Sequence, residues 1–220
     1  MYIRYYMTPS PVTISPGKSI EEARHLLENY HFRHLPVIDE FGGLLGIVTD
    51  RDLRSAYPSS ILDDGDRQKV LDRVKQTPVG KIISTVNAFL SPQSTLDDAL
   101  ILFEKRTVGA LPVVNGNNLV VGILSFSDLL KALRSFFGLG QKGSVLVAIR
   151  AEDKSQSKSK LVRILEDMNV VFTRLVRTGG SDREPAMIYL RINTFNVRVV
   201  HRAIEQAGFE VHLPVADPDE

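Results

Sequence analysis

Two short segments of the chain carry residue types that can hold a sugar. They are Gly46-Ile47-Val48-Thr49-Asp50-Arg51-Asp52 and Gly122-Ile123-Leu124-Ser125-Phe126-Ser127-Asp128. Each segment has a glycine, two apolar residues, a hydroxyl residue, two variable residues and an aspartate. A carboxylate accepts hydrogen bonds from both neighbouring hydroxyls of a ribose, and a hydroxyl side chain adds a bond to sugar or phosphate. The pattern is therefore compatible with a site for a sugar in each segment.

The glycine and the following helix would complete such a site. A glycine leaves the backbone open to a planar group, and the N-terminal amides of a helix favour phosphate. The same spacing also matches a capping box, in which the hydroxyl and the carboxylate only close the start of the helix. Thr49 with Asp52 and Ser125 with Asp128 fit both interpretations. The spacing alone leaves both open.

Both segments belong to an internal repeat. Residues 3–56 align without a gap with residues 79–132, and Leu35-Pro36-Val37 falls on Leu111-Pro112-Val113. Self-similarity at a fixed displacement indicates a duplicated structural unit. Each copy leaves part of its predicted sheet without cover from its own helices, so we expect the two copies to pack together as one module.

Each copy has the same order of predicted elements: an extended lead-in, a helix, a hairpin of two strands and a second helix. The lead-ins are Val12 to Ser15 and Ala88 to Ser91. Capping boxes that start the first helices are Ser19 with Glu22 and Thr95 with Asp98. The predicted strands are Leu35 to Ile38, Leu44 to Val48, Leu111 to Val114 and Leu119 to Leu124. The second helices are expected to start near Asp52 and Asp128.

The repeat resembles the cystathionine β-synthase (CBS) domain, whose tandem pair forms a Bateman module. The matching features are Met7-Thr8-Pro9, the Leu-Pro-Val strand, the hairpin and the Gly-x-x-Thr/Ser-x-x-Asp ending in both copies. The resemblance covers roughly residues 1–137. It implies that adenosine-containing ligands such as AMP, ADP, ATP, S-adenosylmethionine or NAD bind in clefts between the two repeats.

Carried over residue by residue, the resemblance implies that Thr49 and Asp52 hold one ribose, and that Ser125 and Asp128 hold the other. The backbone of the two strands that begin near His34 and Ala110, with the two lead-ins beside them, would contact adenine. The nucleotide-binding residues predicted in this way are Thr13, Ile14, His34, Leu35, Pro36, Thr49, Arg51, Asp52, Phe89, Leu90, Ala110, Leu111, Pro112, Ser125 and Asp128.

The first copy is the stronger candidate for a ligand with a charged tail. Arg51 lies inside its motif and Arg33 lies near the adenine edge, whereas the second copy has Ser127 and Gly109 at these positions. Lys105 and Arg106 are further candidates for phosphate contacts from across the cleft, with solvated surface bases as the alternative. Phe126 stands where the first copy has Asp50, which indicates a ring that stacks on a base or fills the cleft.

The last third of the chain changes character after the glycine-rich segment Leu139-Gly140-Gln141-Lys142-Gly143. The predicted elements are strands at Ser144 to Arg150, Val170 to Thr178, Ala186 to Asn193 and Phe209 to Leu213, with helices at Lys158 to Met168 and Val197 to Ala207. This βαββαβ order predicts a ferredoxin-like fold and resembles the ACT domain. ACT domains commonly place a glycine after the first strand, but residues 152–157 contain none, so a packing or dimerisation role is the alternative to amino-acid binding.

Composition excludes several classes of function. The chain has no cysteine, which removes disulfides, thiolate nucleophiles and cysteine-held metals, and its net charge of +1 gives no overall attraction to nucleic acid or membrane. No apolar run approaches the roughly 20 residues of a membrane span, so a cytoplasmic location is expected.

His31 and His34 have no third ligand nearby and predict no metal site. Nor is there a nucleophile elbow or P-loop.

The sequence therefore predicts an α/β (α+β) protein with a CBS repeat at residues 1–56, a linker at 57–78, a second repeat at 79–137 and an ACT-like domain at 144–214. The acidic stretch Asp63-Asp64-Gly65-Asp66 is interpreted as part of the linker and not as a cation site. The charged segment Arg67 to Gln76 of this linker is a candidate for a short helix. This layout is similar to that of bacterial acetoin-utilisation regulators. We expect a non-catalytic sensor of adenine nucleotides that forms a homodimer and has no cofactor or metal. A ligand-free scaffold and a nucleic-acid-binding regulator are the alternatives.

Overall fold

The computed structural model describes residues 1–58, 63–84, 88–151, 157–180 and 185–212. The chain divides into two compact units, Met1–Ala132 and Leu133–Glu220. The first unit contains both copies of the repeat. Since each unit has its own sheet and core, the two are described separately.

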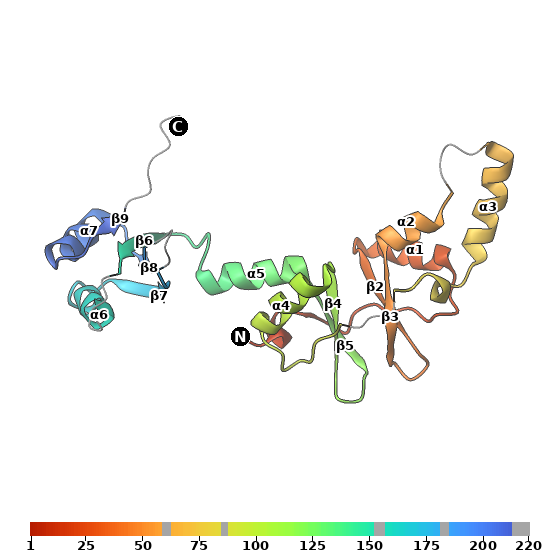
Figure 1. Ribbon diagram of the computed structural model, residues 1–220, viewed down its shortest axis with the longest axis horizontal. Coiled ribbons are helices and arrows are strands. Elements are labelled where there is room, and N and C mark those ends of the chain that lie inside the picture. The colour runs from red at the N-terminus through yellow and green to blue at the C-terminus, as the bar shows by residue number, and fades with distance from the viewer. Residues whose placement is uncertain (59–62, 85–87, 152–156, 181–184, 213–220) are drawn as a thin grey trace. The chain divides into compact units, whose positions relative to one another are not determined.

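The two copies in the first unit share a 3-10 turn, a helix, a hairpin and a second helix in the same order (Figure 1), and the first copy has in addition the short strand β1. The first copy comprises η1 (Ile3–Tyr5), β1 (Thr8–Pro9), α1 (Ile20–Tyr30), β2 (His34–Ile38), β3 (Leu44–Thr49) and α2 (Asp50–Ala56). Helix α3 (Asp64–Gln76) lies between the copies. The second copy comprises η2 (Val79–Lys81), α4 (Leu96–Arg106), β4 (Ala110–Val114), β5 (Val120–Ser125) and α5 (Phe126–Phe137).

The first helix of each copy begins as its sequence predicts. Ser19 Oγ accepts a hydrogen bond from Glu22 N at 3.1 Å, and Thr95 Oγ1 accepts one from Asp98 N at 3.1 Å. In both boxes the acidic side chain accepts in return from the backbone amide of the capping residue. Two orphan amides at each helix start are thereby satisfied.

The two hairpins have the same register. Leu35 pairs with Val48 in the first and Leu111 with Leu124 in the second, and each hairpin has an irregularity at its fourth and fifth pairs. Figure 1 shows the hairpins extending side by side in the same direction. Their tips touch, because Gly43 forms a bridge with Leu119.

The copies also exchange their opening segments. Strand β1 pairs with β5 of the second copy, where Thr8 faces Ile123. At the equivalent place, Ser84 exchanges two backbone hydrogen bonds of 3.2 and 3.1 Å with Ile47 of the first copy. Each hairpin is therefore extended by a segment that precedes the other copy's helix, which explains why the pair forms one unit.

The lead-ins lie beside the first strand of each hairpin. Ile14 N donates to Pro36 O at 3.0 Å, and Leu90 N donates to Pro112 O at 2.9 Å. Ile14 and Leu90 are buried. The core of the first copy combines them with apolar residues of α1, β2 and β3: Ile14, Ile20, Ala23, Leu27, Leu35, Val37, Val48, Leu53 and Val79.

The segment predicted as a linker contains a longer helix than expected. The sequence predicts a short helix at residues 67–76, whereas α3 begins at Asp64. Lys75 Nζ lies 3.8 Å from Glu21 Oε1 on α1. Part of the acidic stretch is thus the first turn of a helix, where acidic residues are favoured.

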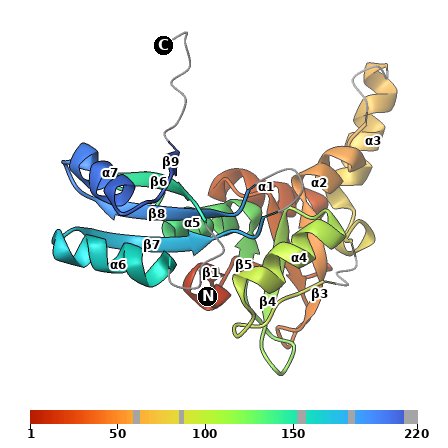
Figure 2. The same ribbon diagram turned by 60° about the vertical axis from the view of Figure 1, so that its left-hand side comes forward.

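The second unit has a four-stranded antiparallel sheet in the order β7-β8-β6-β9. Its elements are β6 (Ser144–Arg150), α6 (Ser157–Asp167), β7 (Val171–Arg177), β8 (Met187–Asn193), α7 (Val197–Gln206) and β9 (Val211–His212). The predicted order of strands and helices is therefore present. Helices α6 and α7 lie next to each other beside the sheet (Figure 2).

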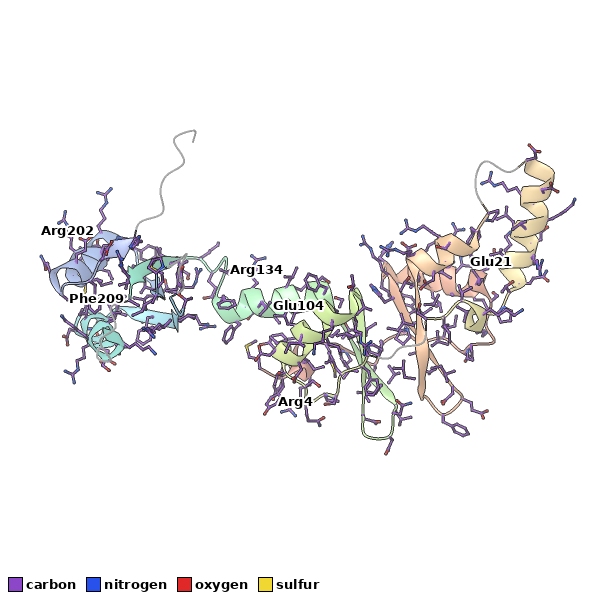
Figure 3. The ribbon with its side chains drawn as sticks, viewed as in Figure 1. Arg4, Glu21, Glu104, Arg134, Arg202 and Phe209 are labelled. Carbon is purple, nitrogen blue, oxygen red and sulfur yellow. The ribbon has the colours of Figure 1, made fainter. Side chains whose placement is uncertain are left out.

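Alternate residues of β6 and β8 make the core of this unit. Val147, Ile149, Ile188, Leu190 and Ile192 pack against apolar residues of both helices. Phe209, labelled in Figure 3, joins this core, and Lys160 Nζ lies 5.4 Å from the centre of its ring. The apolar core residues alternate along each strand, as in strands with one covered face. Arg191, which stands between two of them on β8, is also buried.

No helix in the described ranges is long and apolar enough to cross a membrane.

Candidate functional site

The hydroxyl and aspartate of the first motif form a capping box at the start of α2. Asp52 Oδ2 accepts hydrogen bonds from Thr49 N at 2.8 Å and from Thr49 Oγ1 at 2.7 Å. Asp52 N donates to Thr49 Oγ1 at 3.2 Å. The capping interpretation of this spacing is thus correct for the structure.

The second motif repeats the arrangement at the start of α5. Asp128 Oδ2 accepts from Ser125 N at 3.1 Å and from Ser125 Oγ at 2.6 Å, and Asp128 N donates to Ser125 Oγ at 3.2 Å. Burial raises the pKa of Asp128, but the hydrogen bonds from Ser125 and the nearby Lys131 outweigh it, and the net pKa is lowered. The carboxylate is therefore ionised at neutral pH.

Capping uses only one oxygen of each carboxylate. Asp52 Oδ1 has no hydrogen-bond partner among the described residues, and Asp128 Oδ1 accepts from Lys131 Nζ at 3.2 Å. Both side chains are partly buried, and each also lines a cavity. The two interpretations left open by the spacing are compatible.

The first cavity has a volume of about 590 Å³ and contains the first motif. Its lining is Arg33, His34, Ile47, Thr49, Asp50, Arg51, Asp52, Arg54, Ser84, Ala88, Arg106, Thr107, Val108, Gly109, Ala110 and Leu111.

The second cavity has a volume of about 820 Å³ and contains the second motif. Its lining is Thr8, Ser10, Pro11, Val12, Tyr30, His31, Phe32, Arg33, His34, Gly109, Ala110, Ile123, Ser125, Phe126, Ser127 and Asp128. Volumes of this size are typical of small-molecule sites, which run from about 300 to 1,000 Å³.

The two cavities occupy equivalent places in the repeat. Apart from the motifs themselves, Ser84 of the first cavity corresponds to Thr8 of the second, and Arg106 corresponds to Tyr30. The exchanged opening segments thus form one wall of each cavity. Since this exchange pairs residues far apart in the chain, the sequence alone did not reveal Ser84 or Thr8 as lining residues.

The cavities meet at a shared wall made of Arg33, His34, Gly109 and Ala110, which line both. A Cβ atom on Gly109 would lie 2.7 Å from His34 Nε2, so the missing side chain makes room for the imidazole. Burial lowers the pKa of His34, the positive charge of Arg33 lowers it further, and Asp52 opposes them. The imidazole is therefore neutral at pH 7.

Arginines gather on the first cavity. Arg33, Arg51, Arg54 and Arg106 line it, and only Arg54 forms an ion pair, with Asp50 at 2.6 Å, in the described part of the chain. Arg33, Arg51 and Arg106 were candidates from the sequence. Arg54 was not, although its place one helical turn after Asp50 was a usable signal. Lys105 does not line either cavity.

The motif glycines face the chain itself. A Cβ atom on Gly46 would lie 2.8 Å from Ser84 O, and one on Gly122 would lie 2.5 Å from Met7 Sδ. The expectation that these glycines leave room for a planar ligand is therefore wrong. Their missing side chains leave room for the opening segment of the other copy, which packs against each glycine.

The structure brings together about half of the predicted binding residues. Those that line one or both cavities are His34, Thr49, Arg51, Asp52, Ala110, Leu111, Ser125 and Asp128. Those that line neither are Thr13, Ile14, Leu35, Pro36, Phe89, Leu90 and Pro112. Most of the second group belong to the core or its backbone ladder, and their contact with a ligand stays a prediction.

Comparison with known proteins assigns the repeat. The family model for the CBS domain matches residues 3–59 and 79–135, which is more than half of the chain. The chain belongs to the CBS domain family. The CBS domain-containing protein YhcV of Bacillus subtilis is 34% identical over 123 residues, which cover 56% of this chain and 79% of YhcV.

Two solved structures with the CBS fold extend the comparison. An acetoin utilization protein (AcuB) from Vibrio cholerae is 29% identical, with a TM-score of 0.53 over 64% of this chain and 96% of AcuB. CBSX2 in complex with AMP is 26% identical, with a TM-score of 0.51 over 61% of this chain and 96% of CBSX2.

Some of the similar proteins are enzymes. Inosine-5'-monophosphate dehydrogenase of Aquifex aeolicus is 31% identical over 126 residues, which are 57% of this CBS chain but only 23% of the dehydrogenase. The likeness therefore leaves most of that enzyme without a counterpart here.

Proposed function

We propose that this CBS protein is a regulator that binds adenosine-containing ligands in its two cavities. The observation that carries the proposal is the position of Asp52 and Asp128. Each caps a helix with one oxygen and lines a cavity large enough for a nucleoside. A carboxylate that is held by its cap and placed in a cavity is suited to accept bonds from a ribose diol.

The remaining lining residues complete the proposed sites. Thr49 and Ser125 add hydroxyls beside the ribose, and the shared wall around His34 and Ala110 lies where adenine would pack. The AMP complex of CBSX2 supports this class of ligand, because its chain has the same fold at 26% identity. AMP, ADP and ATP are the ligands that we favour for the first cavity, since its arginines match phosphate.

The role that follows is regulatory and not catalytic. A bound nucleotide changes the protein's contacts only to the extent that it binds one arrangement of the repeats more tightly, and such coupling is typically about 1–3 kcal/mol. In the dehydrogenase of Aquifex aeolicus, the shared region is under a quarter of the chain. We propose that occupancy is transmitted to a second copy in a homodimer or to a protein partner.

The second unit is proposed to be an ACT-like domain. Its βαββαβ element order and the strand order β7-β8-β6-β9 support this assignment. Residues 152–156 after β6, which the sequence analysis used to weigh amino-acid binding, lie outside the described residues. The domain limits, the acetoin-related role and the cytoplasmic location stay predictions.

A ligand-free scaffold is the competing function, because both carboxylates already have a structural task as helix caps. The chain offers a matched control for this alternative. Asp98 forms the same capping box with Thr95, with a hydrogen bond of 2.8 Å, but it lines neither cavity. A change at Asp98 therefore reports on capping alone.

The test is calorimetric titration of the full chain with AMP, ADP, ATP and adenosine. We expect Asp52→Asn to weaken AMP binding at least tenfold, because asparagine keeps an acceptor for the cap but loses the charge that the ribose needs. Asp98→Asn is expected to leave binding unchanged, at a cost of up to about 1 kcal/mol in stability. Absence of binding to all four compounds, or equal effects of both variants, would contradict the proposal.

A further inference from the structure

The two cavities are built from equivalent positions but differ in charge. Four arginines and two aspartates line the first, whereas one arginine and one aspartate line the second. Arg51 of the first cavity corresponds to Ser127 of the second, and Arg106 corresponds to Tyr30. The second cavity therefore lacks both cations at the places where the first cavity has them.

Aromatic side chains take the place of charges in the second cavity. The rings of Tyr30 and Phe32 are stacked, with centroids 5.6 Å apart and planes at 16°. Phe126 replaces Asp50 and is held edge-on to Phe103 at 5.5 Å. Tyr30, Phe32 and Phe126 all line the cavity, and Phe126 keeps 44% of its surface exposed.

Among the described residues, Arg33 is the one arginine that lines the second cavity, and it also lines the first. Arg33 belongs to the wall shared by both cavities. Asp128 is negative, and Lys131, which bonds to Asp128 Oδ1, does not line the cavity. A phosphate placed here would lose its hydration without gaining the charged donors that phosphate sites use. An aromatic wall instead favours flat or apolar groups.

We propose that the second cavity selects adenosine-type nucleosides that carry no phosphate, while the first cavity selects their phosphorylated forms. The inference rests on the proposed function and adds a division of ligand class between the two sites. The ribose is held alike in both, through Asp52 or Asp128. The substituent on the 5' carbon of the ribose decides which cavity a compound enters.

The first test separates the cavities by variant. Calorimetric titration of the full-length Asp52→Asn protein reads the second cavity, and titration of Asp128→Asn reads the first. We expect Asp52→Asn to bind adenosine and 5'-deoxyadenosine at least tenfold more tightly than AMP or ATP. For Asp128→Asn we expect the reverse preference. AMP bound by Asp52→Asn as tightly as adenosine would overturn the inference.

The second test moves a charge between the copies. Ser127→Arg, added to Asp52→Asn, gives the second cavity the arginine that the first copy has, and we expect AMP affinity to rise at least tenfold. Val70→Arg on α3 is the control, because Val70 is exposed and lies outside both cavities. An equal rise with both arginines would contradict a site-specific effect.

The outcomes distinguish this inference from the proposed function. If no adenosine compound binds the unaltered protein, the proposed function itself fails. If AMP binds through Asp52 and adenosine competes for that same site, with no binding through Asp128, only the division between the cavities fails. Thermal melting of each variant establishes that it is folded, and the Asp52→Asn titration decides the question even if Ser127→Arg does not fold.

Discussion

At the scale of single residues, the two motif aspartates each cap a helix and also line a cavity. Oδ2 of Asp52 accepts from Thr49, and Oδ1 remains without a partner in the described chain. The capping bonds also fix the rotamer, so the free oxygen is preorganised. Preorganisation lowers the entropy that a ligand loses on binding.

Gly109 gives a prediction at this scale. We expect Gly109→Ala to displace the His34 imidazole, because the new Cβ would lie 2.7 Å from Nε2. Affinity should then fall in both cavities, whereas the stability loss should be near the lower end of the about 1–3 kcal/mol of overpacking, since the ring can rotate. Titration with AMP and adenosine measures this. Gly116→Ala, which meets nothing within 4 Å, is the control.

His34 also predicts a pH dependence of stability. Its pKa in the folded chain is lowered from the ordinary 6.5, first by burial and then by Arg33. Below pH 6.5 the unfolded chain therefore binds the proton more readily than the folded chain, and the stability due to this group falls as the pH falls. We expect the difference in unfolding free energy between the unaltered protein and His34→Gln to shrink between pH 7.5 and 5.5. Urea unfolding at a series of pH values measures it, and a constant difference would disprove the assignment.

At the scale of elements, the sequence predicts what depends on neighbours along the chain. The capping boxes at Ser19 and Thr95, both hairpins and the βαββαβ order follow from local patterns and are present in the structure. Helix starts differ by about a turn at α3, because Asp63 to Asp66 suit both a loop and a first helical turn. The gapless repeat predicts that Thr49 and Ser125, and likewise Asp52 and Asp128, occupy equivalent positions. It does not predict that Ser84 and Thr8 form the opposite wall of each cavity.

What local pattern could not show is the exchange of opening segments between the copies. Strand β1 and Ser84 pair with residues more than thirty positions away. Because every residue type offers nearly the same backbone donor and acceptor, the local sequence does not show which segment an extended stretch pairs with. For the same reason the role of Gly46 was mistaken. A glycine next to a sugar-binding motif fits a ligand contact and a chain contact equally well, and only the pairing decides.

The exchange predicts that Gly46 is essential for packing. We expect Gly46→Ala to lower the unfolding free energy by about 1–3 kcal/mol, because Cβ would lie 2.8 Å from the backbone oxygen of Ser84, which is held in the ladder. Gly17→Ala, at an exposed position with nothing within 4 Å, should change stability by less than about 1 kcal/mol. Chemical denaturation compares them, and equal losses would refute the steric explanation.

At the scale of the whole molecule, the chain consists of two units with separate cores. Both cavities lie in the first unit. A ligand that binds only the folded state adds RT ln(1 + [L]/Kd) to stability, which is about 2.7 kcal/mol at a hundredfold excess over Kd. The added stability belongs to the unit that holds the site.

We therefore expect ATP to slow hydrogen exchange of the most protected amides within residues 1–132, with smaller changes in strands β6, β7 and β8. Mass spectrometry of peptides with and without ATP measures this. The Asp52→Asn protein under the same conditions controls for effects of ATP outside the first cavity. Equal protection throughout the chain would contradict the placement of the site.

The wall of Arg33, His34, Gly109 and Ala110 has a consequence for what such a protein can measure. Because these residues line both cavities, a ligand that moves the His34 imidazole from one side alters the room on the other. If the proposed ligands bind as we infer, binding in one cavity is expected to lower affinity in the other. The protein would then respond to the ratio of the two ligands rather than to the concentration of either.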